Sequence, residues 1–167
     1  MDETTLTLLP LLRKCWMKKG QQLCIPTPGQ QRWHHIFGAY NWRTDQIIWI
    51  TAQKKNSTSF IYFLEHLMCS LKTDKPIVLV LDNASYHHSQ VSKAALACFE
   101  DRLMICWLPP YCSDLNPIER FWRHLKDYAC ANKLFANIDA IVQSVNRCLF
   151  QQNCFSNSDR FLFAKSF

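Results

Sequence analysis

The sequence predicts an α/β fold in which a mixed sheet is covered by helices on both faces. Two strand-like segments, 33–42 and 46–51, are joined by a short polar turn. Five branched apolar residues follow Pro76, which is typical of a strand that is buried on both faces. Between and after these segments, apolar residues recur at helical spacing, so strands are expected to alternate with helices.

The helices and the last strand are predicted from local patterns. In 57–71, a Ser/Thr start precedes an apolar stripe at helical spacing, formed by Phe60, Phe63, Leu64, Leu67 and Met68. A similar stripe is expected in the helix that starts at Pro117: Ile118, Trp122, Leu125 and Ala129. The complete set of further expected elements is a helix at 89–99, a strand within 103–109, and helices at 117–130 and 137–150.

Length and composition indicate one globular domain over residues 1–167. The chain has 49% apolar residues and three glycines, which excludes a disordered chain. No run approaches the roughly 18 apolar residues of a membrane-spanning helix, and the acidic start argues against an export signal. Nine cysteines, an odd number, favour reduced thiols. We therefore expect a cytoplasmic protein, associated with the nucleoid if it is bacterial.

A net charge of +6 favours a polyanionic partner, with nucleic acid as the first candidate. The alternative is an ordinary solvated surface, which charge alone does not distinguish. The basic residues cluster in three places: Arg13, Lys14, Lys18 and Lys19; Lys54 and Lys55; and Arg120, Arg123 and Lys126.

Two carboxylates stand at positions that suit a site. Asp82 ends the most apolar predicted strand, where ligands of open α/β sheets bind, although an Asx turn is an alternative. Glu119 lies in the first turn of the helix after Asn116 and Pro117, where it could serve as a capping-box residue. If the fold brings Asp82 and Glu119 together, a hard cation such as Mg²⁺ would offset their repulsion.

Two motifs resemble one transposase family. "LVLDNASYH" followed by "LPPYCSDLNPIERFWRHLK" is similar to the catalytic domain of IS630/Tc1/mariner transposases, and "WMKKGQ", "IPTPGQQR" and "IFGAYNWRTDQIIW" also match its pattern. The resemblance implies an RNase H-like fold with an acidic triad, here Asp2, Asp82 and Glu119. It further implies two Mg²⁺ or Mn²⁺ ions held by this triad, and metal-dependent cleavage and strand transfer at transposon ends. The implied partners are DNA, a second transposase subunit or an upstream helix-turn-helix polypeptide.

The same resemblance suggests supporting residues. His87 matches the family's histidine, which would touch phosphate or support the metal site; a structural histidine bonded to nearby backbone is the alternative. Asn83 and Asn116 are expected to hold the acid-bearing loop and helix in shape. Three basic residues after Glu119 are candidate phosphate contacts. The alternative is that they form i,i+4 ion pairs with Glu119 on the helix and belong to the solvated surface. They are Arg120, Arg123 and Lys126.

The match has three departures. The chain opens at Met1-Asp2, so the first strand is expected to be missing and Asp2 to be a frayed end. No helix-turn-helix region is found, and Ser113 replaces a family proline before Glu119. We expect Asp82 and Glu119 to approach within shared-metal distance, and Asp2 to join them only if an upstream segment pairs into the sheet. The alternatives to an active transposase are an inactive remnant that binds DNA or transposase subunits, and a general RNase H-like nuclease.

Overall fold

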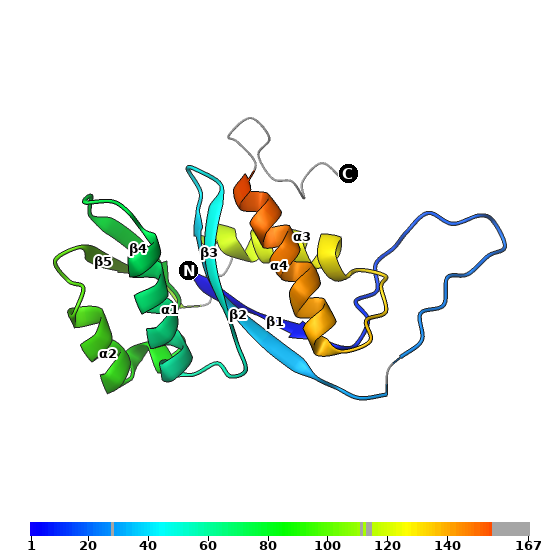
Figure 1. Cartoon of the computed structure of the whole chain (residues 1–167), viewed down its shortest axis with the longest axis horizontal. Coiled ribbons are helices and arrows are strands. Elements are labelled where there is room, and N and C mark those ends of the chain that lie inside the picture. Colours follow the sequence, from blue (N-terminus) through cyan, green and yellow to red (C-terminus); the bar gives the residue numbers. More distant parts are fainter. Residues whose placement is uncertain (28, 111, 113–114, 155–167) are drawn as a thin grey trace.

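The computed structural model describes residues 1–27, 29–110, 112 and 115–154. Every predicted helix and strand is present in this part of the chain, and α4 extends past the expected end at residue 150. The elements are β1 (Asp2–Thr7), β2 (Trp33–Asn41), β3 (Gln46–Ala52), α1 (Ser57–Ser70), β4 (Ile77–Leu81), the 3₁₀ helix η1 (Ser85–His88), α2 (Gln90–Ala97), β5 (Leu103–Trp107), α3 (Pro117–Cys130) and α4 (Ile138–Cys154). The predicted mixed α/β architecture is confirmed (Figure 1).

The expectation of a missing first strand is wrong, because β1 forms directly from Asp2. It pairs antiparallel with β2, with Asp2 opposite Gly38, and β2 pairs antiparallel with β3. The backbone nitrogen of Met1 donates to the carbonyl of Val80 at 2.8 Å, so the start of β1 also lies beside β4. Asp2 is therefore a residue inside the sheet region, not a frayed end.

Alternation along β1 and its neighbours separates two apolar cores. Leu6 and Ile36 face α3 and α4, whereas Phe37 faces α1, β4 and β5. Because side chains of a strand alternate between the two faces, Asp2 shares the face of Leu6, and Glu3 shares the face of its partner Phe37. One strand thus presents two neighbouring carboxylates to opposite sides of the sheet.

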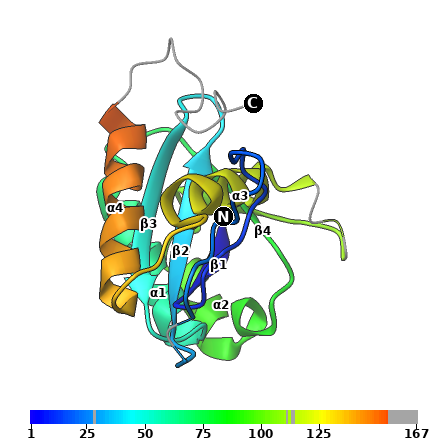
Figure 2. The same ribbon diagram turned by 90° about the vertical axis from the view of Figure 1, so that its right-hand side faces the viewer.

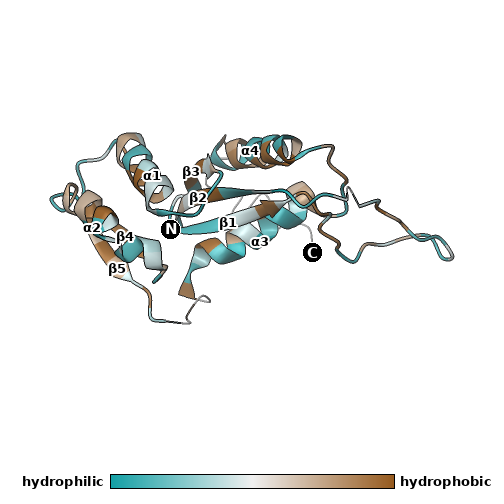
Figure 3. Ribbon diagram, turned by 90° about the horizontal axis from the view of Figure 1, so that it is seen from below, coloured by the Kyte–Doolittle hydropathy of each residue, from teal (hydrophilic) through white to brown (hydrophobic). Residues whose placement is uncertain are grey.

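The helices bury the stripes that the sequence predicts. In α1 the five expected residues are all buried. In α3 the four expected residues are buried together with Phe121. Figures 1 and 2 show α3 and α4 together beside the three-stranded sheet, while α1 and α2 lie with β4 and β5. Apolar and polar residues alternate around these helices (Figure 3).

A long segment joins β1 to β2 and extends away from the rest of the molecule (Figures 1 and 3). Its base is tied to the end of α3, because Asn132 N donates to Leu11 O at 2.8 Å and Arg13 Nε contacts Asp127 Oδ1 at 2.7 Å. Asn132 also accepts from Arg13 N through its side chain. These contacts place Arg13 beside α3. Within the described residues, no helix is long and apolar enough to cross a membrane.

Gly38 sets how closely α3 approaches the sheet. A Cβ atom at this position would lie 2.7 Å from Cη2 and 2.8 Å from Cζ2 of Trp122, a residue of α3. We predict that Gly38→Ala lowers the free energy of unfolding by about 1–3 kcal/mol, because the added methyl group would overpack the contact with Trp122.

Urea denaturation measures this change, and Trp122→Phe supplies the matched test because it removes these two ring atoms. The destabilisation by Gly38→Ala should be smaller in the Trp122→Phe background than in the wild type. Equal stability of Gly38→Ala and the wild type would contradict this close approach.

Candidate active site

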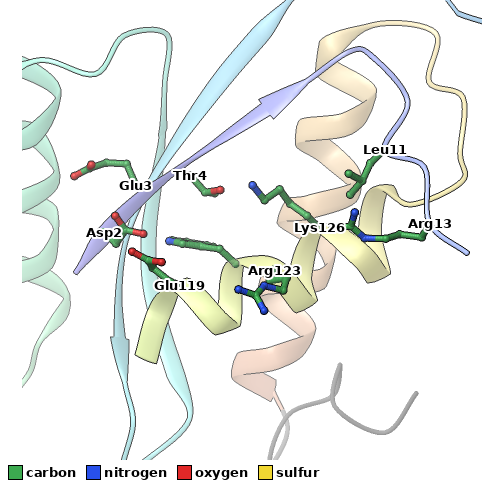
Figure 4. A pocket seen from close by; sticks show the side chains of 9 residues that line it. Asp2, Glu3, Thr4, Leu11, Arg13, Glu119, Arg123 and Lys126 are labelled. Carbon is green, nitrogen blue, oxygen red and sulfur yellow. The ribbon is translucent and has the colours of Figure 1, made fainter. Parts of the chain in front are cut away.

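A pocket of about 420 Å³ opens between β1 and α3 (Figure 4). Its carboxylates gather at the start of β1 and of α3, and its basic residues lie further along α3 and at Arg13. The lining residues are Asp2, Glu3, Thr4, Leu11, Arg13, Glu119, Trp122, Arg123 and Lys126. The pocket therefore has an acidic end beside a basic end.

Asp2 and Glu119 point toward one another in this pocket (Figure 4). Glu119 is held in the first turn of α3, and the Asn116 side chain donates to Met1 O at 3.3 Å, which ties the start of the helix to the start of β1. Burial raises the pKa of Asp2 to about 6, and the nearby charges of Glu3, Glu119 and Asp82 add to this effect. Asp2 is thus a carboxyl group that loses its proton against the repulsion of other acids.

Asp82 is the first residue after β4, and its side chain is 45% exposed. Its Oδ1 accepts from the backbone N–H of Ala84 at 3.1 Å and lies 3.0 Å from Nδ1 of His87. The hydrogen bond with His87 lowers the pKa of Asp82, and the hydrogen bond from the Ala84 N–H lowers it further. Together they outweigh the partial burial of Asp82, which raises its pKa. Asp82 does not line the pocket, but its charge acts on Asp2.

The charges of Asp82 and Glu119 both raise the pKa of Asp2, but the three predicted metal ligands form no closed cage in the described part of the chain. Among the described residues, no three histidine, cysteine, aspartate or glutamate side chains converge closely enough to hold one ion. The shared-metal distance therefore stays a prediction. The donors nevertheless suit a hard cation, because all three are carboxylates and a cation would offset both the burial of Asp2 and the repulsion from Glu119 and Asp82.

His87 is fully buried between two acids. Its Nδ1 faces Asp82, and its Nε2 lies 3.3 Å from Oε1 of Glu3, within ion-pair distance although not aligned as a hydrogen bond. Burial lowers the pKa of His87, but the contacts with Asp82 and Glu3 outweigh it and raise the pKa to about 9. At neutral pH the ring is therefore an imidazolium between two carboxylates.

The other predicted site residues have distinct positions. Asn83 donates to Leu108 O at 2.5 Å and so ties the end of β4 to the residue after β5. Asn116 occupies the N-cap position of α3, but its side chain makes no capping hydrogen bond and reaches β1 instead. Arg120 is exposed and does not line the pocket. Ser113 lies outside the described residues.

Two basic residues that the sequence predicts as phosphate contacts line the pocket. Arg123 is exposed, and Lys126 is half-buried, so that desolvation lowers the pKa of Lys126. They follow Glu119 by four and seven residues, which places all three on one face of α3. Arg13 joins them from the base of the long segment.

Two residues that line the pocket, Glu3 and Arg13, are not predicted individually from the sequence. Glu3 is not among the predicted site residues, and Arg13 is predicted only as part of a basic cluster. Strand alternation after Asp2 would have placed Glu3 on the opposite face. No sequence signal indicates that Arg13 folds back onto α3, because that contact joins residues more than a hundred positions apart.

Comparison with known proteins identifies the family. A family model described as "DDE superfamily endonuclease" matches residues 1–142. The chain belongs to this family. It is 27% identical over 144 residues to the insertion element IS630 uncharacterized 39 kDa protein of Shigella sonnei, covering 86% of this chain and 42% of that protein. It is also 27% identical over 110 residues to the protein y4pE/y4sA of Sinorhizobium fredii, covering 66% and 78% of the two chains.

Solved structures show the fold of this DDE domain. It resembles the chain in a Mos1 transposase paired-end complex with a left transposon end, with a TM-score of 0.67 and 13% identity, over 89% of this chain and 46% of that one. It resembles the Mos1 strand transfer complex with a TM-score of 0.67 and 15% identity, again over 89% and 46%. The predicted RNase H-like fold is thereby confirmed. The family model and the IS630 relative bear out the IS630/Tc1/mariner resemblance. The chain spans less than half the length of the IS630 and Mos1 proteins.

Without metal, we predict that the ionised Asp2 carboxylate destabilises the fold. Its folded pKa is about 6 against 3.8 for the ordinary group, so between these values the folded chain binds more protons than the unfolded chain. This contribution to stability is present below about pH 4 and is lost as the pH rises through about 6. Relative to Asp2→Asn, the wild type should lose on the order of 2 kcal/mol between about pH 4 and about pH 7.

Urea denaturation in the presence of a chelator measures this difference, because other titrating groups occur in both proteins and cancel. Asp74→Asn, which changes an exposed carboxylate, is the matched control. An unchanged difference between wild type and Asp2→Asn across this pH range would contradict the raised pKa of Asp2, and with it the burial and the neighbouring charges that cause it.

Proposed function

We propose that this chain is the catalytic portion of a DNA transposase, which cleaves phosphodiester bonds and transfers a strand at transposon ends. The observation that supports this most directly is the pocket in which Asp2 and Glu119 face each other beside a row of basic residues. Family membership and the Mos1 likeness agree with it, and one Mos1 mariner paired-end complex contains Mn. Asp2, Asp82 and Glu119 would hold two Mg²⁺ or Mn²⁺ ions.

The residues of the pocket suit this chemistry. When bound, divalent ions supply activation of the attacking water or 3′-hydroxyl and stabilise the leaving oxygen. Asp2 and Glu119 would fix this positive charge between β1 and α3. α3 is held close to the sheet because Trp122 packs against Gly38 of β2, the residue opposite Asp2. Arg123 and Lys126 would bind phosphates next to the cleaved bond, which orients the DNA strand along α3.

The partners that we propose follow from this transposase function. DNA is the substrate, and the chain acts in the cytoplasm, in association with the nucleoid if it is bacterial. Specific recognition of transposon ends requires a DNA-reading element such as a helix-turn-helix polypeptide. Two of the Mos1 structures are paired-end complexes, and we propose that this domain likewise works as a pair of transposase subunits.

Cleavage of supercoiled DNA tests the proposed activity. The purified chain should nick the plasmid with Mg²⁺ or Mn²⁺, and Asp2→Asn, Asp82→Asn and Glu119→Gln should each reduce the nicking rate at least about a hundredfold, because each removes a charged metal ligand. Glu65→Gln, which neutralises an exposed carboxylate on α1, is the matched control.

Two outcomes would contradict this function. Equal nicking by the wild type and the three acid variants would exclude the triad, and a folded wild type without nicking would favour the inactive remnant. An RNA–DNA hybrid substrate distinguishes a general RNase H-like nuclease, since a transposase domain should cleave DNA in preference to the hybrid.

Arg123 and Lys126 give a second prediction. Arg123→Ala and Lys126→Ala should each weaken DNA binding, and each should lower the slope of log affinity against log salt by about one, because each removes one phosphate contact. Lys75→Ala changes an exposed lysine outside the pocket and is the matched control. Fluorescence anisotropy at several salt concentrations measures the slopes. Equal slopes for all variants would mean that the strand does not run along this face of α3.

A further inference from the structure

Glu3 is a buried carboxylate that the proposed chemistry does not use directly. Its side chain is 4% exposed and projects to the face opposite Asp2. Burying a carboxylate is costly unless a charged partner compensates it, and such buried pairs contribute little to stability compared with well-packed apolar residues. The contact of Glu3 with His87 therefore calls for a role other than filling the core.

The imidazole of His87 is fixed in place. The ring is fully buried, and its centroid lies 4.5 Å from the ring of Phe60 and 4.5 Å from the ring of Tyr86. Glu3 lies at one nitrogen of this ring and Asp82 at the other. The ring therefore joins two carboxylates in one orientation.

Both short contacts of Asp82 engage the same oxygen. Nδ1 of His87 and the backbone N–H of Ala84 approach Oδ1 at 3.0 and 3.1 Å. Neither contact uses Oδ2, and the Asp82 side chain is 45% exposed. With Oδ1 held, rotation of the carboxylate is restricted and Oδ2 is the oxygen that remains to face a cation.

We propose that Glu3 is a positioning residue of the metal site, which fixes His87 so that His87 fixes Asp82 with Oδ2 directed to a divalent ion. This inference rests on the proposed function. It gives β1 two roles, since Asp2 contributes a carboxylate directly on one face and Glu3 acts through His87 from the other. Partners that orient metal ligands in this way typically change metal affinity by 10–100-fold when they are mutated.

Mn²⁺ binding tests the inference without relying on activity. Isothermal calorimetry on the full chain should give 10–100-fold weaker Mn²⁺ binding for Glu3→Gln than for the wild type. Glu65→Gln, which makes the same charge change on the exposed side of α1, should bind as the wild type does. Circular dichroism and thermal melting establish that each variant is folded.

His87→Asn completes a double-mutant cycle, because the shorter amide keeps a donor near Asp82 but no longer reaches Glu3. In this background Glu3→Gln should weaken Mn²⁺ binding less than twofold, since its effect passes through His87. The double variant also removes the buried carboxylate that His87→Asn alone would leave uncompensated. In metal-free protein, the side-chain carboxyl ¹³C resonance of Asp82 should shift in Glu3→Gln and not in Glu65→Gln.

Three results would overturn the inference. Wild-type Mn²⁺ affinity in folded Glu3→Gln would show that Glu3 does not position the site, while the proposed function would stand. A full effect of Glu3→Gln in the His87→Asn background would show that Glu3 acts directly through charge. Absence of Mn²⁺ binding by the wild type would overturn the proposed metal site, and the inference with it.

Discussion

The structure depends on the position of β1, which pairs with β2 and whose preceding residue, Met1, is hydrogen-bonded to β4. The hydrogen bond from Met1 N to Val80 O brings the antiparallel sheet beside the parallel pair β4–β5. The same placement puts Asp2 opposite Gly38, the residue whose missing side chain makes room for Trp122 of α3. The acidic end of the pocket is therefore built where three elements meet, and its geometry follows from backbone pairing and packing.

Electrostatics explains why this arrangement suits a cation. Burial raises the pKa of Asp2, and the nearby charges of Glu3, Glu119 and Asp82 raise it further. His87 offsets part of this charge on the side of α1, while Arg13, Arg123 and Lys126 lie further along the pocket. The remaining negative charge is concentrated between β1 and α3, where a divalent ion would stabilise it and a neighbouring phosphate chain would meet the basic residues.

Much of this fold could be predicted from local patterns, because α1, α3 and β4 carry clear apolar periodicity. Asp82 and Glu119 could also be predicted as site residues, since Asp82 directly follows β4 and Glu119 lies in the first turn of α3, and both elements are strongly patterned. β1 was not predicted, because the expectation rested on what would precede Asp2 and not on the strand-forming residues after it. The roles of Glu3 and Arg13 depend on contacts distant in sequence, with His87 and with the end of α3, and such contacts leave no local signal.

The proposed function requires that Asp2, Asp82 and Glu119 together hold divalent metal. Anomalous diffraction from crystals of the chain grown with Mn²⁺ tests it most directly, because the signal locates the ions independently of the protein atoms. We expect anomalous peaks between Asp2 and Glu119, with Asp82 Oδ2 among the ligands of at least one ion. Ordered Mn²⁺ elsewhere on the chain, or none at this end of the pocket at saturating concentration, would contradict it.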